Sequence, residues 1–267
     1  MKDHLRELIR DLDPHAARNT MREYLQARIL EGLQRVGAMS PLAFQGGTAL
    51  RFLYRLPRYS EDLDFALEGP RESYDPRRWL TSITGQFRRE GYNAVASLRD
   101  AGTVHAGWLR FGGLPHEFGL SSHRDEPLRI KLEVDTRPPV GAVTETRLVR
   151  RHVSLRIHHH DPTSLLAGKL HAVLHRPWMK GRDIYDLAWH LSDPGWPPPN
   201  LDLLNAARRQ TEPAAMALTK DTWRETVAAR IAGAEWKAVE ADIRPFLESG
   251  NDVPARADVL DLLRSRR

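Results

Sequence analysis

Residues 45–65, Gln-Gly-Gly-Thr-Ala-Leu-Arg-Phe-Leu-Tyr-Arg-Leu-Pro-Arg-Tyr-Ser-Glu-Asp-Leu-Asp-Phe, carry the pattern that decides the fold. The pattern predicts the end of a strand, a glycine turn, a helix over about 48–56 and a second strand over 62–67. Side chains at positions i and i+2 of a strand point to the same side. The carboxylates of Asp62 and Asp64 are therefore expected to lie together on one face of that second strand.

Two neighbouring carboxylates on an otherwise apolar strand need a counter-ion, because like charges at short distance repel and burial disfavours them further. A divalent cation supplies that charge, and hard oxygen ligands suit Mg²⁺. Gly46 and Gly47 let the backbone come close to a polyphosphate at the N-terminus of the following helix. A Gly-Gly turn or an Asp-x-Asp pair alone is common, and it is their order and spacing that predict phosphoryl or nucleotidyl transfer.

The same stretch resembles the opening of the nucleotidyltransferase fold shared by polymerase-beta-like enzymes, and more narrowly the AbiEii/AbiGii toxins of type IV toxin–antitoxin systems. That family's pattern is Gly-Gly-Thr followed by Arg-x-Ser-x-Asp-Leu-Asp-Phe. Its places are filled here by Gly46, Gly47 and Thr48 and then by Arg58, Ser60, Asp62, Leu63, Asp64 and Phe65. The resemblance implies an α+β fold with a nucleotidyltransferase-type mixed sheet and flanking helices, followed by a mainly helical C-terminal half.

A third carboxylate is expected on the alternating strand 128–135. Lys131, Glu133 and Asp135 share one side of that strand, opposite its apolar residues. The resemblance centres on Lys-x-Glu, which makes Glu133 the first choice for completing a metal site and Asp135 the alternative. The competing interpretation is an ordinary surface Lys–Glu pair.

The second half of the chain contributes a further motif, Lys180-Gly-Arg-Asp-Ile-Tyr-Asp-Leu187, after a helix that carries Lys169. The resemblance implies that Lys169 binds the triphosphate and that Asp183 acts near the nucleotide or as a base. Asp186, three residues further on, could share or take over that role. The alternative is that Arg182 with Asp186, or Lys180 with Asp183, forms a helix-surface ion pair.

Composition limits the class of protein. The chain has 267 residues, 41% of them hydrophobic and 28% charged, as in a globular protein. It has no cysteine, no apolar run long enough for a membrane span and no apolar core of a signal peptide near its start, so a cytoplasmic location without a membrane partner is expected. The net charge of +5 favours an anionic partner, and its excess lies between residues 141 and 190.

The periodicity predicts two parts: a nucleotidyltransferase-like αβ domain with N-terminal helices over 1–150, and a mainly helical domain over 151–267 that contributes Lys169 and Asp183 to the site. One helical region over 3–36 and one strand over 148–157 are expected. The triplet His158-His159-His160 is interpreted as surface or nucleic-acid-facing, because three consecutive residues of an extended segment cannot all reach one ion. Trp223 and Trp236 are assigned to the core.

The expected function is therefore metal-dependent transfer of a nucleoside monophosphate from an NTP to an acceptor. Mg²⁺, or Mn²⁺, is the expected cofactor. The resemblance implies a toxin that modifies an RNA, such as the 3′ end of a tRNA, with a cognate antitoxin encoded nearby and a possible place in phage defence. The predicted site residues are Asp62, Asp64 and Glu133 for metal and catalysis, Lys169 and Asp183 for catalysis, and Gly46, Gly47, Thr48, Ser60, Lys169 and Arg182 for nucleotide binding.

Two alternatives remain open from the sequence. The acceptor could be a small molecule, as for antibiotic-modifying relatives, because loops and the variable half set acceptor choice in this fold. The chain could also be a nucleotide-binding module without turnover, although such a module has no need of carboxylates at 62, 64 and 133.

Overall fold

A computed structural model describes residues 2–248 and 253–265. The chain forms two compact units, and each is described by itself. The first unit comprises Met1–Arg55, Tyr59–Pro138 and Thr146–His159. The second comprises Leu56–Arg58, Pro139–Glu145 and His160–Arg267.

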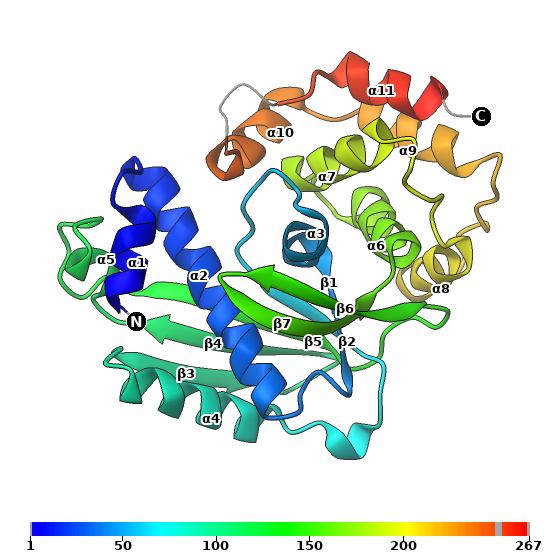
Figure 1. Cartoon of the computed structure of the whole chain (residues 1–267). Coiled ribbons are helices and arrows are strands. Elements are labelled where there is room, and N and C mark those ends of the chain that lie inside the picture. The colour runs from blue at the N-terminus through cyan, green and yellow to red at the C-terminus, as the bar shows by residue number, and fades with distance from the viewer. Residues whose placement is uncertain (1, 249–252, 266–267) are drawn as a thin grey trace. The chain divides into compact units, whose positions relative to one another are not determined.

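The first unit is built on a seven-stranded mixed sheet of order β3-β4-β5-β2-β1-β7-β6 (Figure 1). Its strands are β1 (Leu42–Gln45), β2 (Leu63–Leu67), β3 (Ala94–Arg99), β4 (Val104–Phe111), β5 (Leu128–Asp135), β6 (Thr144–Arg151) and β7 (Val153–His160). Its helices are α1 (Lys2–Ile9), α2 (Pro14–Arg35), α3 (Gly46–Tyr54), the short 3-10 turn η1 (Arg71–Ser73), α4 (Pro76–Arg89) and α5 (Leu114–Glu117). The predicted fold class, a nucleotidyltransferase-type mixed sheet with flanking helices, is confirmed.

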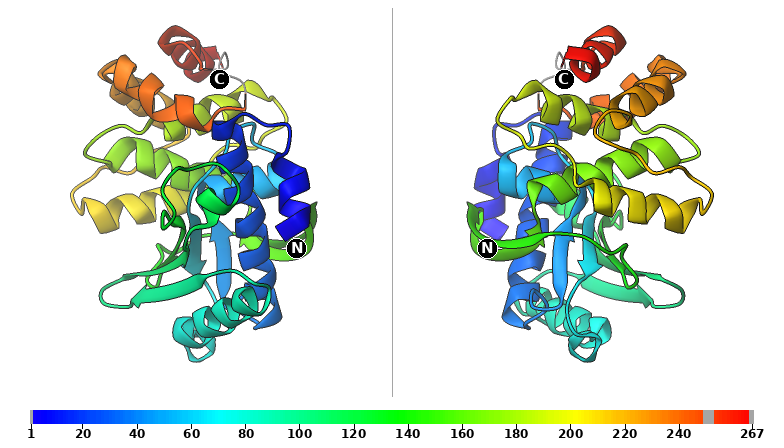
Figure 2. Two further views of the ribbon diagram at one scale, coloured as in Figure 1. Left: turned by 90° about the vertical axis from the view of Figure 1, so that its left-hand side faces the viewer. Right: turned by 90° about the vertical axis from the view of Figure 1, so that its right-hand side faces the viewer.

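One face of this sheet is apolar and covered by helices. α4 packs along β3 and β4, as Figures 1 and 2 show. Gly107 of β4 lies directly beneath Leu80 of α4, where an added Cβ would come within 2.9 Å of Leu80 Cδ1. Phe44 and Phe65 pack together on β1 and β2 with ring centroids 5.1 Å apart. Because side chains alternate along each strand, the polar residues of β2 and β5 are left on the opposite face.

The N-terminal helical region is divided, contrary to the expectation of one helix over 3–36. Asp13 caps α2 by accepting hydrogen bonds from the backbone N–H groups of His15 and Ala16, and Pro14 occupies the first helical position. Proline cannot donate to a preceding turn, so it starts a new helix more readily than it continues one. The chain therefore forms α1 and α2 as separate helices.

A buried acid of α2, Glu23, links this helix to the end of β6 and to the residue that follows it. Glu23 accepts hydrogen bonds from Arg151 and His152 and pairs with Arg51 of α3. Burial opposes ionisation, but the hydrogen bonds from His152 and Arg151 hold the pKa of Glu23 at about 2. His152 has a positive φ of 57° and separates β6 from β7. The expectation of one strand over 148–157 was therefore wrong, since the left-handed residue at 152 interrupts it.

Two residues of the histidine triplet at the end of β7 are buried, and His158 is half-buried. His159 and His160 are 0% and 4% exposed, and Nδ1 of His158 lies 3.1 Å from the carbonyl oxygen of Leu42. The interpretation of a surface or nucleic-acid-facing triplet was wrong. Parallel pairing of β7 with β1 brings His159 level with Phe44 inside the sheet.

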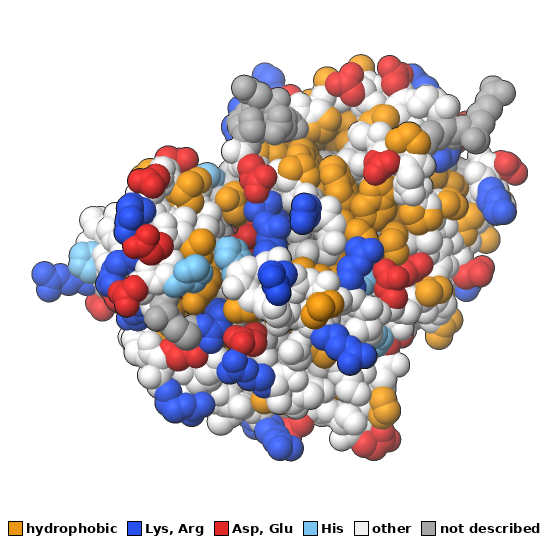
Figure 3. Space-filling model, in the orientation of Figure 1, with side chains coloured by type: hydrophobic (Ala, Val, Ile, Leu, Met, Phe, Trp, Pro, Cys, Tyr) orange, Lys and Arg blue, Asp and Glu red, His pale blue; other side chains and the backbone are white. Residues whose placement is uncertain are grey.

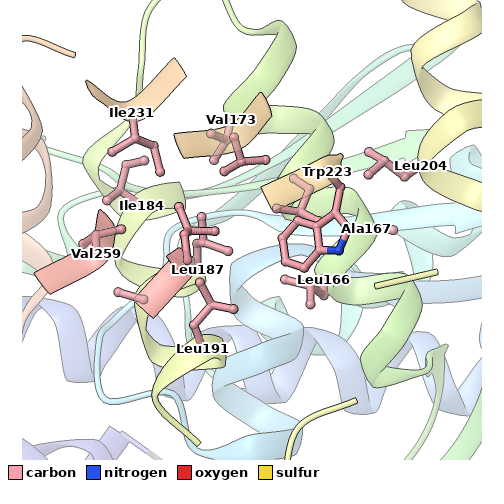
Figure 4. Packing of buried hydrophobic residues seen from close by; sticks show 14 of the residues in the cluster. Leu166, Ala167, Val173, Ile184, Leu187, Leu191, Leu204, Trp223, Ile231 and Val259 are labelled. Atoms are coloured by element: carbon pink, nitrogen blue, oxygen red, sulfur yellow. The ribbon is translucent and has the colours of Figure 1, made fainter. Parts of the chain in front are cut away.

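The second unit is helical and has its own core. Its helices are α6 (Pro162–His175), α7 (Gly181–Ser192), α8 (Leu201–Thr211), α9 (Trp223–Ala232), α10 (Trp236–Ile243), η2 (Arg244–Phe246) and α11 (Arg256–Ser265). Figure 4 shows Ile184 and Leu187 of α7 packed among residues of the neighbouring helices. Trp223 is 3% exposed and Trp236 packs against the cluster, which confirms their assignment to the core.

Hydrophobic side chains also gather on the surface of this unit, as the orange patch in the upper part of Figure 3 shows. Trp178 and Met216 are 67% and 86% exposed, and both lie outside helices and strands. Apolar atoms make up much of any protein surface, so these exposed side chains do not by themselves indicate a partner.

The pH dependence of stability is expected to come partly from His190 of α7. This side chain is 1% exposed and lies against Trp196, with ring centroids 4.1 Å apart. Burial lowers the pKa of His190 to about 4 from a usual value of 6.5. Between pH 6.5 and 4, the unfolded chain binds a proton at His190 that the folded state does not bind. The contribution of neutral His190 to the free energy of unfolding is therefore complete above pH 6.5 and is lost as the pH falls from there toward 4.

Lowering the pH from 7 to 5 should reduce the free energy of unfolding by about 2 kcal/mol through His190. Urea unfolding of His190→Leu at both pH values measures this, and the variant should lose that much less than the wild type. An equal loss in both proteins would contradict a neutral, buried His190.

Candidate active site

The glycine turn stands directly against the strand that carries the acids. Gly46 begins α3 and has φ of 78°, a conformation that side-chain-bearing residues rarely adopt. A Cβ at Gly46 would run into Oδ2 of Asp64. β1 pairs with β2 so that Gln45 lies level with Asp64. Glycine is therefore required at position 46 both by its conformation and by the approach of the Asp64 carboxylate.

The segment that precedes β2 is held in place by hydrogen bonds from two helices. The buried hydroxyl of Thr48 donates to the carbonyl oxygen of Asp62. The Gln26 side-chain amide donates to the carbonyl oxygens of Ser60 and Glu61, at 3.0 and 2.9 Å. Gln26 is 1% exposed and was missed by the sequence analysis, since one buried glutamine in a helix has no distinguishing pattern. The backbone around Asp62 is thus fixed by residues outside the motif.

The acidic strands are neighbours in the sheet. β2 and β5 pair in parallel, and Asp64 lies level with Glu133. Side chains of paired residues lie on the same face, so these two carboxylates occupy adjacent positions on the polar face. Asp62 stands just before β2, two residues ahead of Asp64. The pairing therefore brings two of the predicted acids, Asp64 and Glu133, to adjacent positions.

Asp135 lies less favourably than Glu133 for joining Asp62 and Asp64. It lies level with Ala66, beyond Asp64, and accepts a hydrogen bond of 2.9 Å from the backbone N–H of Arg137. Burial raises the pKa of Asp135 above its usual value. The geometry therefore favours Glu133 over Asp135 as the third carboxylate.

Glu133 has a positive partner on its own strand. Nζ of Lys131 lies 2.7 Å from Oε1 of Glu133, with both side chains about 30% exposed. Among residues 2–248 and 253–265, no group of three His, Asp or Glu side chains is close enough to hold a metal ion. The Asp62–Asp64 pair has the oxygen donors that a hard cation requires, while the charge of Glu133 is balanced here by Lys131.

The second unit holds a buried network of opposite charges. Arg58, from the 56–58 segment, donates to both oxygens of Asp186, each at 2.6 Å. Nζ of Lys169 lies 2.7 Å from Asp186 and 3.1 Å from Asp183. Nη1 of Arg176 lies 3.0 Å from Oδ2 of Asp183. Asp186 and Arg58 are 0% and 1% exposed, so the network is internal to the unit.

The two acids of this network differ in their surroundings. Burial opposes ionisation of Asp186, but Arg58 and Lys169 more than compensate and lower its pKa. Burial likewise opposes the Lys169 ammonium, yet Asp186 and Asp183 raise its pKa above the usual value. Both oxygens of Asp183 also face cations, Oδ1 that of Lys169 and Oδ2 that of Arg176. The difference between the two acids is therefore one of partner, because Asp186 binds the buried Arg58 whereas Asp183 binds Arg176, whose side chain is 38% exposed.

Arg182 lies in a different environment from the one expected of it. Its backbone N–H donates to Asp242 at 3.1 Å, and its guanidinium lies over the ring of Phe246, 4.3 Å from the centroid. Its side chain lies 3.6 Å from Asp242 rather than pairing with Asp186. The alternative of an Arg182–Asp186 surface pair was therefore wrong, because Asp186 is buried against Arg58.

The requirement for glycine at 46 predicts a measurable effect. Gly46→Ala should lower the free energy of unfolding by about 1–2 kcal/mol, because alanine is strained in the left-handed backbone conformation. The added Cβ should also displace the Asp64 carboxylate and so abolish activity. Gly37→Ala is the matched control, because Gly37 has φ of 77° but nothing within 4 Å of an added Cβ. Urea unfolding should show destabilisation in both variants, larger at position 46 because of the clash with Asp64, and activity assays should show inactivation only at position 46. Equal activity in both would contradict the contact with Asp64.

The mixed sheet, the glycine turn and the paired acidic strands are the features of a nucleotidyltransferase. The chain belongs to the family described as "Nucleotidyl transferase AbiEii toxin, Type IV TA system", whose profile matches residues 28–262. The protein is accordingly a nucleotidyltransferase of a toxin–antitoxin family.

Solved structures share the fold. MenT4, a nucleotidyltransferase toxin from Mycobacterium tuberculosis H37Rv, superposes with a TM-score of 0.62 at 16% identity, over 98% of this chain and 88% of that one. JHP933 from Helicobacter pylori superposes with a TM-score of 0.51 at 16% identity, over 92% and 90%. No curated protein sequence matches the chain. No helix in the described part of the chain has the length and hydropathy of a membrane span.

Proposed function

We propose that this nucleotidyltransferase transfers a nucleoside monophosphate from an NTP to the 3′ end of an RNA, such as a tRNA, with release of pyrophosphate. The observation that carries the proposal is the position of Asp64 level with Glu133, beneath the Gly46 turn. Family membership supports the reaction class and the role as a toxin. The basic balance of the chain supports a polyanionic acceptor.

Asp62, Asp64 and Glu133 would hold Mg²⁺ or Mn²⁺, which supplies charge stabilisation for the phosphates when bound. Glu133 would join the pair after its ion pair with Lys131 opens. Carboxylate oxygens are the donor set that such hard cations prefer.

The other predicted residues have roles in holding the nucleotide. The backbone at Gly46 and Gly47 would lie against the triphosphate, and Ser60 would donate a hydrogen bond to it. Thr48 contributes indirectly, because its hydroxyl fixes the Asp62 carbonyl. In this way the two helices that position the acids also shape the triphosphate site.

In the second unit we assign charge stabilisation on the phosphates to Lys169, with Arg182 as a further phosphate ligand. Asp183 is the acid available for proton transfer, since Asp186 is occupied by Arg58. These assignments extend the family pattern to residues at matching positions of this chain.

The experiment that tests the proposal follows the α-phosphate. Purified protein is incubated with Mg²⁺, total RNA and each NTP carrying a label on either the α- or the γ-phosphate. Label from the α-position should enter RNA, and label from the γ-position should appear in pyrophosphate. Absence of α-label from RNA with all four NTPs would contradict the RNA acceptor. Growth arrest on expression, relieved by the neighbouring gene, tests the toxin–antitoxin pairing.

A further inference from the structure

A groove of about 510 Å³ in the first unit opens beside the catalytic acids. Asp62 and its neighbour Glu61, from the segment before β2, stand in its wall. The other lining residues come from α2, β4, β5 and the segment before β5, and they include Arg18, Arg22, Trp108, Glu126, Arg129 and Lys131. Of the residues described, neither Gly46 nor Gly47 lines this groove. It is therefore separate from the glycine turn but shares Asp62 with the reaction centre.

An aromatic ring and a cation form one side of the groove. β4 and β5 pair so that Trp108 lies level with Lys131. Both project from the polar face of the sheet, since the preceding residue Gly107 faces α4. Trp108 is half-buried, and Nζ of Lys131 lies 5.9 Å from its ring centroid. A flat ring in this position offers a stacking surface for a nucleobase.

Positive side chains surround that ring. Arg18 pairs with Glu126 at 2.6 Å, and Arg22 lies 3.6 Å from Glu61. Arg129 is exposed, and no ion pair for it occurs within residues 2–248 and 253–265. Phosphate oxygens can replace carboxylates as partners of such cations. Aromatic stacking combined with cations along a groove is how proteins bind single-stranded nucleic acid.

We propose that this groove binds the 3′-terminal nucleotides of a single-stranded RNA acceptor. Trp108 stacks on a base, while Arg129 and Lys131 contact the phosphates. In-line displacement places the attacking hydroxyl and the leaving pyrophosphate on opposite sides of the α-phosphorus. A groove that reaches Asp62 without involving the glycine turn meets this requirement. The assignment rests on the proposed function, because it supplies the acceptor for that reaction.

Binding of RNA without nucleotide or metal tests the groove independently of catalysis. A fluorescent single-stranded RNA with a free 3′-hydroxyl is titrated with the full chain, and anisotropy is recorded at several salt concentrations. Trp108→Ala should weaken binding by about 10-fold or more, and Trp108→Phe should restore most of it, because phenylalanine keeps a stacking face. Arg129→Glu should weaken binding and reduce the salt slope by at least about 1.

The matched charge reversal is Arg89→Glu, at an exposed position at the end of α4, on the other side of the sheet. It should leave RNA affinity unchanged. NTP affinity, measured separately by calorimetry, should be the same in all variants, and thermal melting should show that each is folded.

The outcomes separate this groove from the reaction. In one outcome, RNA binding depends on Trp108 and Arg129 although the protein transfers no label. That result would support RNA binding in this groove and contradict the proposed function. The opposite outcome is that label enters RNA while the Trp108→Ala and Arg129→Glu variants bind RNA as tightly as the wild type and have the same KM for it. That result would overturn the assignment of RNA binding to this groove and leave the proposed function standing. Absence of any RNA binding, as a protein or small-molecule acceptor would give, overturns it as well.

Discussion

Replacing Asp64 with asparagine should lower nucleotidyl transfer by at least about 10³-fold, because a metal-binding carboxylate contributes several kcal/mol to stabilising the transition state. Asparagine keeps the size of the side chain but removes the negative charge. The fold should survive, since Asp64 is only partly buried and its backbone pairing with Gln45 and Glu133 does not depend on that charge. The measurement is transfer of α-label to RNA at saturating Mg²⁺, together with thermal melting.

The control for this replacement is Asp100→Asn, which removes an exposed acid paired only with Arg77 at the surface. That variant should keep full activity, because exposed ion pairs contribute little to structure. Asp64→Asn should also require more Mg²⁺ for any remaining activity. Activity within a few-fold of the wild type in Asp64→Asn and in Asp62→Ala would refute the assignment of these acids to a metal.

The sequence was a sufficient guide to the acidic strands. Alternation along 128–135 gave both the bounds of β5 and the side on which Glu133 lies, because a half-buried strand must alternate. The order of glycine turn, helix and Asp-Leu-Asp likewise predicted β1, α3 and β2. The alternation was enough for β5 because only one of its faces is fully buried, whereas β1, α3 and β2 are buried on most sides and were predicted from the motif instead.

Long-range partners could not be predicted in this way. Arg58 appeared in the motif only as a family position, and its pairing with Asp186 joins residues 128 positions apart. The sequence does not distinguish a buried arginine from an exposed one, so periodicity could not predict that Arg58 is buried. The histidine triplet was misjudged for the same reason, since parallel pairing with β1, not the local sequence, buries His159.

The choice between Asp183 and Asp186 shows what geometry adds. Both lie in the first two turns of α7, and the sequence pattern put Asp183 first while leaving Asp186 as an alternative. The structure separates them, because Asp186 accepts two hydrogen bonds from the buried Arg58 guanidinium whereas Asp183 pairs with the more exposed Arg176. We therefore expect substitutions at 186 to act first on stability.

Asp186→Asn should destabilise the protein by about 3–5 kcal/mol, the cost of removing one partner from a buried ion pair. The replacement removes the carboxylate that pairs with two buried cations, Arg58 at 2.6 Å and Lys169 at 2.7 Å. Arg58→Met should cost less, because Asp186 keeps Lys169 as its partner at 2.7 Å and a methionine fills much of the space. Urea unfolding at pH 7 measures both variants, with Asp100→Asn as the surface control expected to change stability by less than about 1 kcal/mol.

The order of the two effects is the decisive observation. In the ion pairs described here, Arg58, Lys169 and Arg176 face Asp186 and Asp183, so removing Asp186 takes negative charge away from buried cations while removing Arg58 takes one of the cations away. Because the pKa of Asp186 is lowered in the folded state, its contribution is complete at neutral pH and is lost only as pH falls through that lowered value. The stability difference between wild type and Asp186→Asn should therefore be constant from pH 8 to pH 6. A larger loss in Arg58→Met than in Asp186→Asn would show that Arg58, not Asp186, is the centre of the network.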